Sequence, residues 1–150
     1  MLALTRVARV GRVDAHVETA AGMTLLRGRV VSDGLAADAA WVLVDGDRIV
    51  DVGTGAPPAA DRTIDGAVVA PGFVDLHCHG GAGVAFDDGE AAIEQAMAFH
   101  RRHGTTRQLA SLVTGSLDDM TARTAAVAAV AARDDRLLGV HLEGPCIAEA

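Results

Sequence analysis

The chain has 150 residues, of which 50% are hydrophobic but only 3% aromatic, and its formal net charge is -7 at pH 7. A core of small aliphatic side chains is typical of α/β proteins, and an acidic chain lacks the basic surface that non-specific nucleic-acid binding requires. Its two cysteines are too few for a disulfide framework, so a cytoplasmic location is expected. No apolar run approaches the roughly 20 residues of a membrane span, so no membrane partner is expected.

Residues 1–23 are expected to form a loose amino-terminal extension. They contain three arginines, Arg6, Arg9 and Arg12, but no continuous apolar core, so they do not resemble a signal peptide. Regular alternation of apolar and polar residues begins only at Thr24, so Met1 and Met23 both stay open as the natural start.

Residues 24–69 are predicted to form part of a small β-domain. The Asp45-Gly46-Asp47 sequence separates two runs rich in β-branched residues and predicts a tight hairpin. The alternation predicts strands over residues 24–31, 41–44, 48–52 and 63–69.

Residues 70–150 show a different pattern, in which strands alternate with helices. Strands are predicted at 73–79, 109–114 and 137–142, with helices at about 87–103 and 116–131. Asp87 or Asp88 is expected to cap the first helix, with Glu90 completing a capping box, and Ser116 is expected to cap the second. This alternation predicts parallel strands joined by helical crossovers.

Two histidines stand one residue apart at the end of the first of these strands. Residues i and i+2 of a strand point to the same face, so His77 and His79 are expected to project side by side and to hold one metal ion. Glycines follow at once, among them Gly80 and Gly81. They would let the next loop pass close to a metal and a substrate; a flexible turn is the simpler interpretation.

Glu143 follows the third strand of this region, and sites in parallel α/β sheets form at the carboxyl ends of strands. If the sheet curls into a barrel, the carboxylate can converge on His77 and His79. Two imidazoles and a carboxylate form a standard ligand set for zinc or iron. A cap or loop anion is the alternative for Glu143.

Five stretches carry a resemblance to a known family: Pro71–Gly81, Asp87–Gly89, His103–Thr106, Leu112–Thr114 and Gly139–Pro145. In these stretches the chain resembles the N-acetylglucosamine-6-phosphate deacetylase family of the amidohydrolase superfamily, over about residues 24–145. The first stretch is shared by many amidohydrolases, whereas the His141-Leu142-Glu143-Gly144-Pro145 ending is far more specific to this family.

The resemblance implies an α/β fold in which residues 70–150 form the first three strands of a metal-dependent-hydrolase (β/α)₈ TIM barrel. Residues 24–69 would be part of a small β-sandwich domain, and the chain would be truncated. The general-base aspartate, and therefore every catalytic residue, is expected beyond Ala150. The parent enzyme is expected to be a homodimer.

The implied reaction of the parent enzyme is metal-dependent removal of acetate from N-acetylglucosamine 6-phosphate, an amino-sugar phosphate. His77 and His79 would bind the divalent metal, zinc or iron, and Glu143 would bind or bridge metals. The 150-residue chain by itself is expected to be inactive. Two alternatives stay open: another amidohydrolase that acts on amides or cyclic amides, and a non-catalytic metal-binding remnant.

Two further polar residues share the predicted strand faces with the metal ligands. Asp75 could orient His77 as a hydrogen-bonding carboxylate, or pair with a backbone or basic group. His141 lies below Glu143 on the third strand, where it is either a supporting group or a satisfied core histidine.

The remaining candidates have simpler expected roles. His100 and His103 lie in the last turn of the predicted first helix, where capping or solvation is expected. Cys78 is expected to face the helix layer as a small hydrophobe. Cys146 is expected to be an inert thiol, with a metal ligand or an oxidisable thiol as the alternative.

Overall fold

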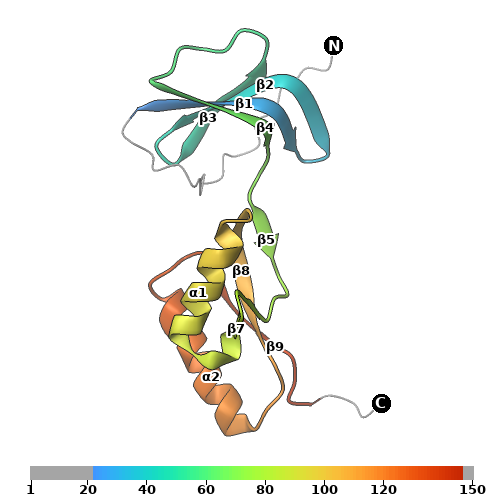
Figure 1. Ribbon diagram of the computed structural model, residues 1–150, viewed down its shortest axis with the longest axis vertical. Helices are drawn as coiled ribbons and strands as arrows, with labels where there is room; N and C mark the ends of the chain where they lie inside the picture. The colour runs from blue at the N-terminus through green and yellow to red at the C-terminus, as the bar shows by residue number, and fades with distance from the viewer. Residues whose placement is uncertain (1–21, 147–150) are drawn as a thin grey trace. The chain divides into compact units, whose positions relative to one another are not determined.

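The computed structural model describes residues 22–146, which fall into two compact units, Met1–Pro71 and Gly72–Ala150 (Figure 1). Each unit is described by itself. Within the described residues no helix is long and apolar enough to cross a membrane. The expected extension over residues 1–23 lies almost wholly outside the described range, in which Met23 already begins a strand.

The first unit is a four-stranded sheet with the strand order β3-β2-β1-β4. Strand β1 pairs antiparallel with β2, which pairs antiparallel with β3, and β4 pairs parallel with β1. The strands are β1 (Met23–Ser32), β2 (Leu35–Asp45), β3 (Arg48–Thr54) and β4 (Arg62–Val69). The predicted strands and the hairpin at Asp45-Gly46-Asp47 are confirmed, although β2 begins at Leu35 rather than at Trp41.

A second tight turn joins β1 to β2 and was missed in the sequence. Asp33 and Gly34 have φ angles of 50° and 74°. Two consecutive positive φ angles are typical of the type I′ hairpin turn, in which Asp-Gly is a preferred pair. The Asp33-Gly34 dipeptide could therefore have predicted this turn. The alanine-rich start of β2 after it does not resemble a strand, so the turn was not recognised.

Trp41 forms the centre of the apolar face of this sheet. It is 8% exposed and packs with Leu25 and Leu43. Its ring lies over Gly53, its partner on β3, where a Cβ atom would come within 2.5 Å of the indole. The close approach of the Trp41 ring to the main chain of β3 therefore requires glycine at position 53.

A bidentate ion pair joins β1 to β4. Arg27 Nε lies 2.7 Å from Asp65 Oδ1, and Arg27 Nη2 lies 3.0 Å from Asp65 Oδ2, between two residues that are partners across the parallel pair. These hydrogen bonds lower the pKa of the Asp65 carboxyl, and the opposite charge of Arg27 adds to the effect.

Asp65→Asn is expected to destabilise this sheet at neutral pH and to have no effect in strong acid. Because the folded-state pKa is depressed, the stabilisation is present above the unfolded value of about 3.9 and is lost as the pH falls through the folded value. Fluorescence of Trp41, the single tryptophan, should show a lower thermal midpoint for the variant at pH 7. Arg27→Gln should lower the thermal midpoint by the same amount, and the double variant should be no less stable than either single variant. A difference in midpoint between wild type and Asp65→Asn that stays constant with pH would contradict the prediction.

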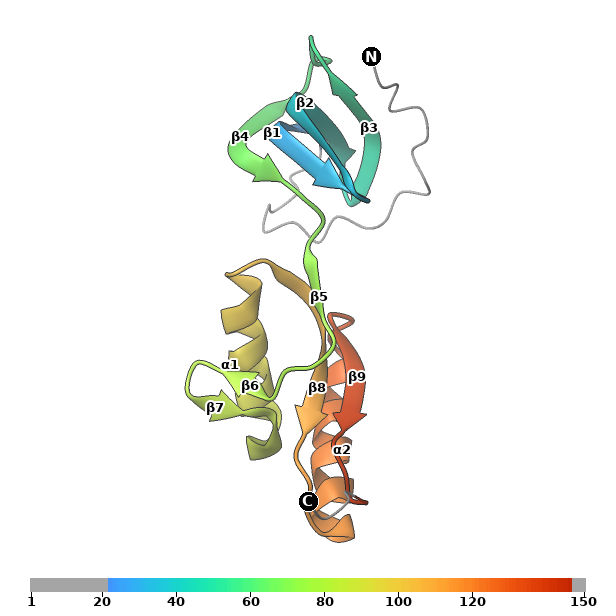
Figure 2. The ribbon, with the colours of Figure 1, turned by 90° about the vertical axis from the view of Figure 1, so that its right-hand side faces the viewer.

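The second unit is a parallel sheet with both long helices packed on one face (Figure 2). Its strands are β5 (Phe73–Asp75), β8 (Thr105–Leu112) and β9 (Leu137–Leu142), in the order β5-β8-β9. Both strand pairs are parallel, as predicted. The connecting elements are a small hairpin of β6 (Gly80–Gly81) and β7 (Val84–Ala85), a short helix η1 (Phe86–Asp88), α1 (Glu90–Arg101) and α2 (Leu117–Ala131).

The helix starts were predicted correctly for α2 and wrongly for α1. Ser116 caps α2, and its Oγ accepts a hydrogen bond from the Asp119 amide at 3.1 Å. The N-cap of α1 is Gly89, because the turn η1 occupies the residues that were expected to cap it. Asp87 instead accepts hydrogen bonds from the Val113 amide, at 3.3 Å, and from Arg123, at 2.9 Å, and thereby links η1 to β8 and α2.

The core of this unit lies between the sheet and the two helices. The helices contribute Ile93, Ala96, Val127 and Val130 to it, each of which is at most 1% exposed. A bulge in β9 separates Leu137, which is buried, from Gly139 in the pairing with β8. Val140 packs against the core, whereas Leu138, at the bulge, and Leu142, at the end of the strand, are exposed.

Candidate metal centre

His77 and His79 lie close together, although they are not on a strand. Strand β5 ends at Asp75, so the predicted strand over 73–79 and the shared face of Asp75 and His77 are wrong. Backbone contacts hold the segment instead. The Cys78 carbonyl accepts from the Ser111 amide at 2.9 Å, and the His79 carbonyl accepts from the Phe86 amide at 2.9 Å.

Glu143 is held next to the end of β8. Its amide donates to the Leu112 carbonyl at 3.1 Å, and its carbonyl accepts from Thr114 Oγ1 at 2.5 Å. Gly144 has a φ of 123°, and a Cβ atom there would lie 1.9 Å from Thr114 Oγ1. The glycine that follows the glutamate is therefore needed to keep this contact.

The side chains of these three residues converge. The two Nε2 atoms of His77 and His79 are 3.2 Å apart. Glu143 Oε2 lies 3.0 Å from His79 Nε2, and Oε1 lies 3.5 Å from His77 Nε2. The three predicted ligands are thus brought together, with donor atoms all within 4.8 Å of one another.

This donor set fits a divalent metal. Two imidazole nitrogens and a carboxylate are ligands that zinc and iron both accept. His79 presents its Nε2 atom to the other two donors. Its Nδ1 atom is buried and has no hydrogen-bond partner within the described part of the chain. His77 is exposed, whereas His79 and Glu143 are half-buried, which leaves one side of the group open.

His141, two residues before Glu143, lies against His77. The two ring centroids are 4.8 Å apart at an interplanar angle of 66°, and His141 Nδ1 lies 3.0 Å from Ser111 Oγ. Ser111 is fully buried on β8, directly opposite His141 on β9. Sequence reasoning had not assigned Ser111 a role; the strand register was the missing information.

Ser111→Ala is expected to destabilise the protein by about 1 kcal/mol, because the half-buried imidazole of His141 loses its hydrogen-bond partner. Chemical denaturation of Ser111→Ala, His141→Ala and the double variant gives the coupling between the two residues. We expect the double variant to be less destabilised than the sum of the single variants. Strict additivity would show that the 3.0 Å contact does not couple them.

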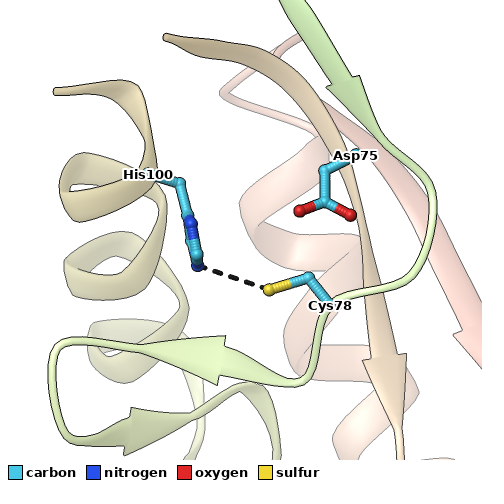
Figure 3. A group of neighbouring side chains, drawn as sticks. All are labelled: Asp75, Cys78 and His100. Carbon is cyan, nitrogen blue, oxygen red and sulfur yellow. Dashed lines mark hydrogen bonds between the residues drawn. The ribbon is translucent and has the colours of Figure 1, made fainter. Parts of the chain in front are cut away.

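Asp75, Cys78 and His100 form a second group (Figure 3). Cys78 Sγ lies 3.3 Å from His100 Nε2, and both atoms contact the Gly80 carbonyl oxygen, at 3.2 Å and 2.9 Å. The expected position of Cys78 against the helix layer is confirmed. Burial raises the pKa of the Cys78 thiol, and the nearby charge of Asp75 also raises it.

Several predicted roles change with this second group. His100 is half-buried and bonded, so the expected capping or solvation role is wrong for it, whereas His103 is exposed as expected. Asp75 contacts His77 through the main chain only, its Oδ1 accepting from the His77 amide at 3.1 Å. Cys146 is exposed and belongs to neither group.

Gly80 and Gly81 form the first strand of the β6–β7 hairpin, so they are not a flexible turn. Gly80 has a φ of 145°, and a Cβ atom there would lie 2.2 Å from the Val84 carbonyl oxygen. At Gly81 a Cβ atom would lie 2.7 Å from His100 Nε2. Gly80 is therefore required by the backbone of the hairpin, whereas a side chain at position 81 would displace the His100 imidazole.

Comparison with known proteins confirms the resemblance to sugar-phosphate deacetylases. No family model matches the chain. It is 34% identical over 92 residues to N-acetylgalactosamine-6-phosphate deacetylase of Shewanella sp. (strain ANA-3), covering 59% of this chain and 23% of the relative. It is also 34% identical over 92 residues to N-acetylglucosamine-6-phosphate deacetylase of Bos taurus, covering 57% of this chain and 22% of the relative.

Solved structures of deacetylases match the chain over part of their length. N-acetyl-D-glucosamine-6-phosphate deacetylase of Mycobacterium smegmatis, in a variant complexed with N-acetyl-D-glucosamine-6-phosphate, matches with a TM-score of 0.75 and 40% identity. That match covers 82% of this chain and 33% of the solved chain. The Thermotoga maritima enzyme matches with a TM-score of 0.61 and 31% identity, covering 73% and 28%. The chain thus spans about a quarter of the curated relatives' length and about a third of the solved chains.

Proposed function

We propose that this chain is part of a metal-dependent amidohydrolase that removes the acetyl group from N-acetylglucosamine 6-phosphate. The convergence of His77, His79 and Glu143 at the carboxyl ends of parallel strands is the observation that carries the proposal. The 40% identity to a solved deacetylase of this specificity supports the choice of substrate.

His77 and His79 would hold the metal through Nε2, and Glu143 would hold it through its carboxylate. A divalent metal at this position supplies a Lewis acid that polarises the acetamide carbonyl and lowers the pKa of a water molecule. His141 would keep the His77 ring in place through their edge contact. Asp75 would set the position of the His77 main chain through its hydrogen bond.

The hairpin that contains Gly80 and Gly81 would form one wall of the substrate site. It follows directly after His79, and its main chain carries no side chains at these two positions. The general base is proposed to lie outside this sequence. A completed (β/α)₈ barrel, a β-sandwich around the first unit and a homodimer stay predictions from the resemblance, and a cytoplasmic location stays a prediction from the cysteine content.

A second candidate substrate is N-acetylgalactosamine 6-phosphate. The relative from Shewanella bears that name and is as similar to the chain as the bovine deacetylase of the glucosamine compound. The two sugars differ only in the configuration of one hydroxyl group, while the acetamide and the phosphate are common to both. The proposed metal centre therefore serves either substrate equally well.

We expect the 150-residue chain to lose roughly one equivalent of bound zinc when His77 and His79 are both replaced by alanine, because two of three ligands are removed. Elemental analysis after dialysis gives the metal content. Asp118→Asn, which changes an exposed carboxylate on α2, is the matched control and should retain the metal. Equal zinc in the wild type and the double variant would contradict the proposed centre.

The activity itself is tested with the full-length natural protein loaded with zinc or iron. We expect acetate release from N-acetylglucosamine 6-phosphate. Glu143→Gln should lower kcat/KM by about 100-fold or more, because replacing even a residue that only hydrogen-bonds to a metal ligand typically lowers metal affinity or activity 10–100-fold. N-acetylgalactosamine 6-phosphate and a cyclic amide such as dihydroorotate are the competing substrates. Preference for the cyclic amide would overturn the assignment in favour of another amidohydrolase.

A further inference from the structure

Asp75, Cys78 and His100, here called the α1-side group, stand apart from the ligands of the proposed centre. Their donor atoms all lie within 4.8 Å of one another, and all three residues are half-buried. They come from the end of β5, the segment after it and helix α1, and their side chains point toward one another (Figure 3). None of them belongs to the group of His77, His79 and Glu143.

The distances within the α1-side group suit a small tetrahedral ion. Cys78 Sγ and His100 Nε2 are 3.3 Å apart, and the Gly80 carbonyl oxygen lies 3.2 Å and 2.9 Å from them. Zinc bonds of about 2.0–2.3 Å place neighbouring tetrahedral ligands about 3.3–3.8 Å apart. Shifts of a few tenths of an ångström bring Cys78 Sγ, His100 Nε2 and the Gly80 carbonyl oxygen to these spacings, whereas the Asp75 carboxylate, within 4.8 Å of the other two side-chain donors, would have to turn toward the ion.

The charges of the group also suit zinc. A thiolate and a carboxylate together neutralise a divalent cation, and a neutral imidazole adds a third side-chain ligand. Binding would release the thiol proton of Cys78 to solvent, as it does when any cysteine binds a metal. The Gly80 carbonyl is the nearest candidate for a fourth ligand.

Gly81 leaves room beside the group. A Cβ atom at this position would lie 2.7 Å from His100 Nε2. The absence of a side chain at Gly81 therefore lets the His100 imidazole keep its place next to Cys78 Sγ.

We propose that Asp75, Cys78 and His100 bind a zinc ion of their own. The ion would tie α1 to the segment that carries His77 and His79. Its role would be structural, because it would lie on the helix side of that segment and would join the end of β5, the segment after it and helix α1.

Cobalt substitution tests this proposal with the 150-residue chain. A thiolate ligand gives Co²⁺ an intense sulfur-to-metal charge-transfer absorption in the near ultraviolet, which histidine and carboxylate ligands do not give. We expect this absorption in the wild type and in His77→Ala/His79→Ala, and its loss in Cys78→Ser. His100→Gln should weaken cobalt binding by at least about tenfold, as expected for the loss of one ligand.

The chain provides matched controls for both substitutions. Cys146→Ser removes the other thiol, and His103→Gln changes an exposed histidine near the same helix end; both should retain the absorption. Circular dichroism establishes that each variant is folded. If Cys78→Ser does not fold, His100→Gln decides the matter.

The outcome is separable from that of the proposed function. No charge-transfer absorption in the wild type, or an absorption lost only in Cys146→Ser, would overturn the zinc site at the α1-side group. Loss of zinc in His77→Ala/His79→Ala would still support the first centre in that case. Conversely, thiolate-bound cobalt with unchanged metal content in that double variant would support the second site alone.

Discussion

The site depends on one hydrogen bond between main-chain groups, from the Ser111 amide to the Cys78 carbonyl, 2.9 Å long. Strand β5 has already ended at Asp75, and this contact holds the residue between the two histidines against the end of β8. Because the Cys78 side chain packs into the helix layer, the imidazoles on either side of it meet each other and Glu143. Two-residue spacing thus brings His77 and His79 together without a continuous strand.

Parallel pairing then brings the glutamate to the histidines. Strands β5, β8 and β9 run in one direction, so the residues that follow them gather at one edge of the sheet, where α/β proteins place their sites. Glu143 continues the pairing with β8 past the end of β9 through the Leu112 carbonyl. Each turn at this edge is restricted by close contacts, as the space at Gly144 and Gly80 shows.

One short segment serves two groups of polar side chains. His77 and His79 face Glu143, whereas Cys78 between them faces His100 on α1. A shift of α1 would therefore move the Cys78 side chain and, through its main chain, both imidazoles.

The sequence by itself determined the parallel β–α–β–α–β order of the second unit and the cap at Ser116, because these depend on local periodicity and on short-range capping. It also indicated that His77, His79 and Glu143 meet, because all three follow strands of one parallel sheet. Tertiary structure decided the rest. The short η1 turn made Asp87 a partner of Arg123 rather than a helix cap, and a bulge in β9 separates the buried Leu137 from the exposed Leu138. The roles of Ser111 and His100 depend on contacts with residues at least 20 positions away, which no local pattern encodes.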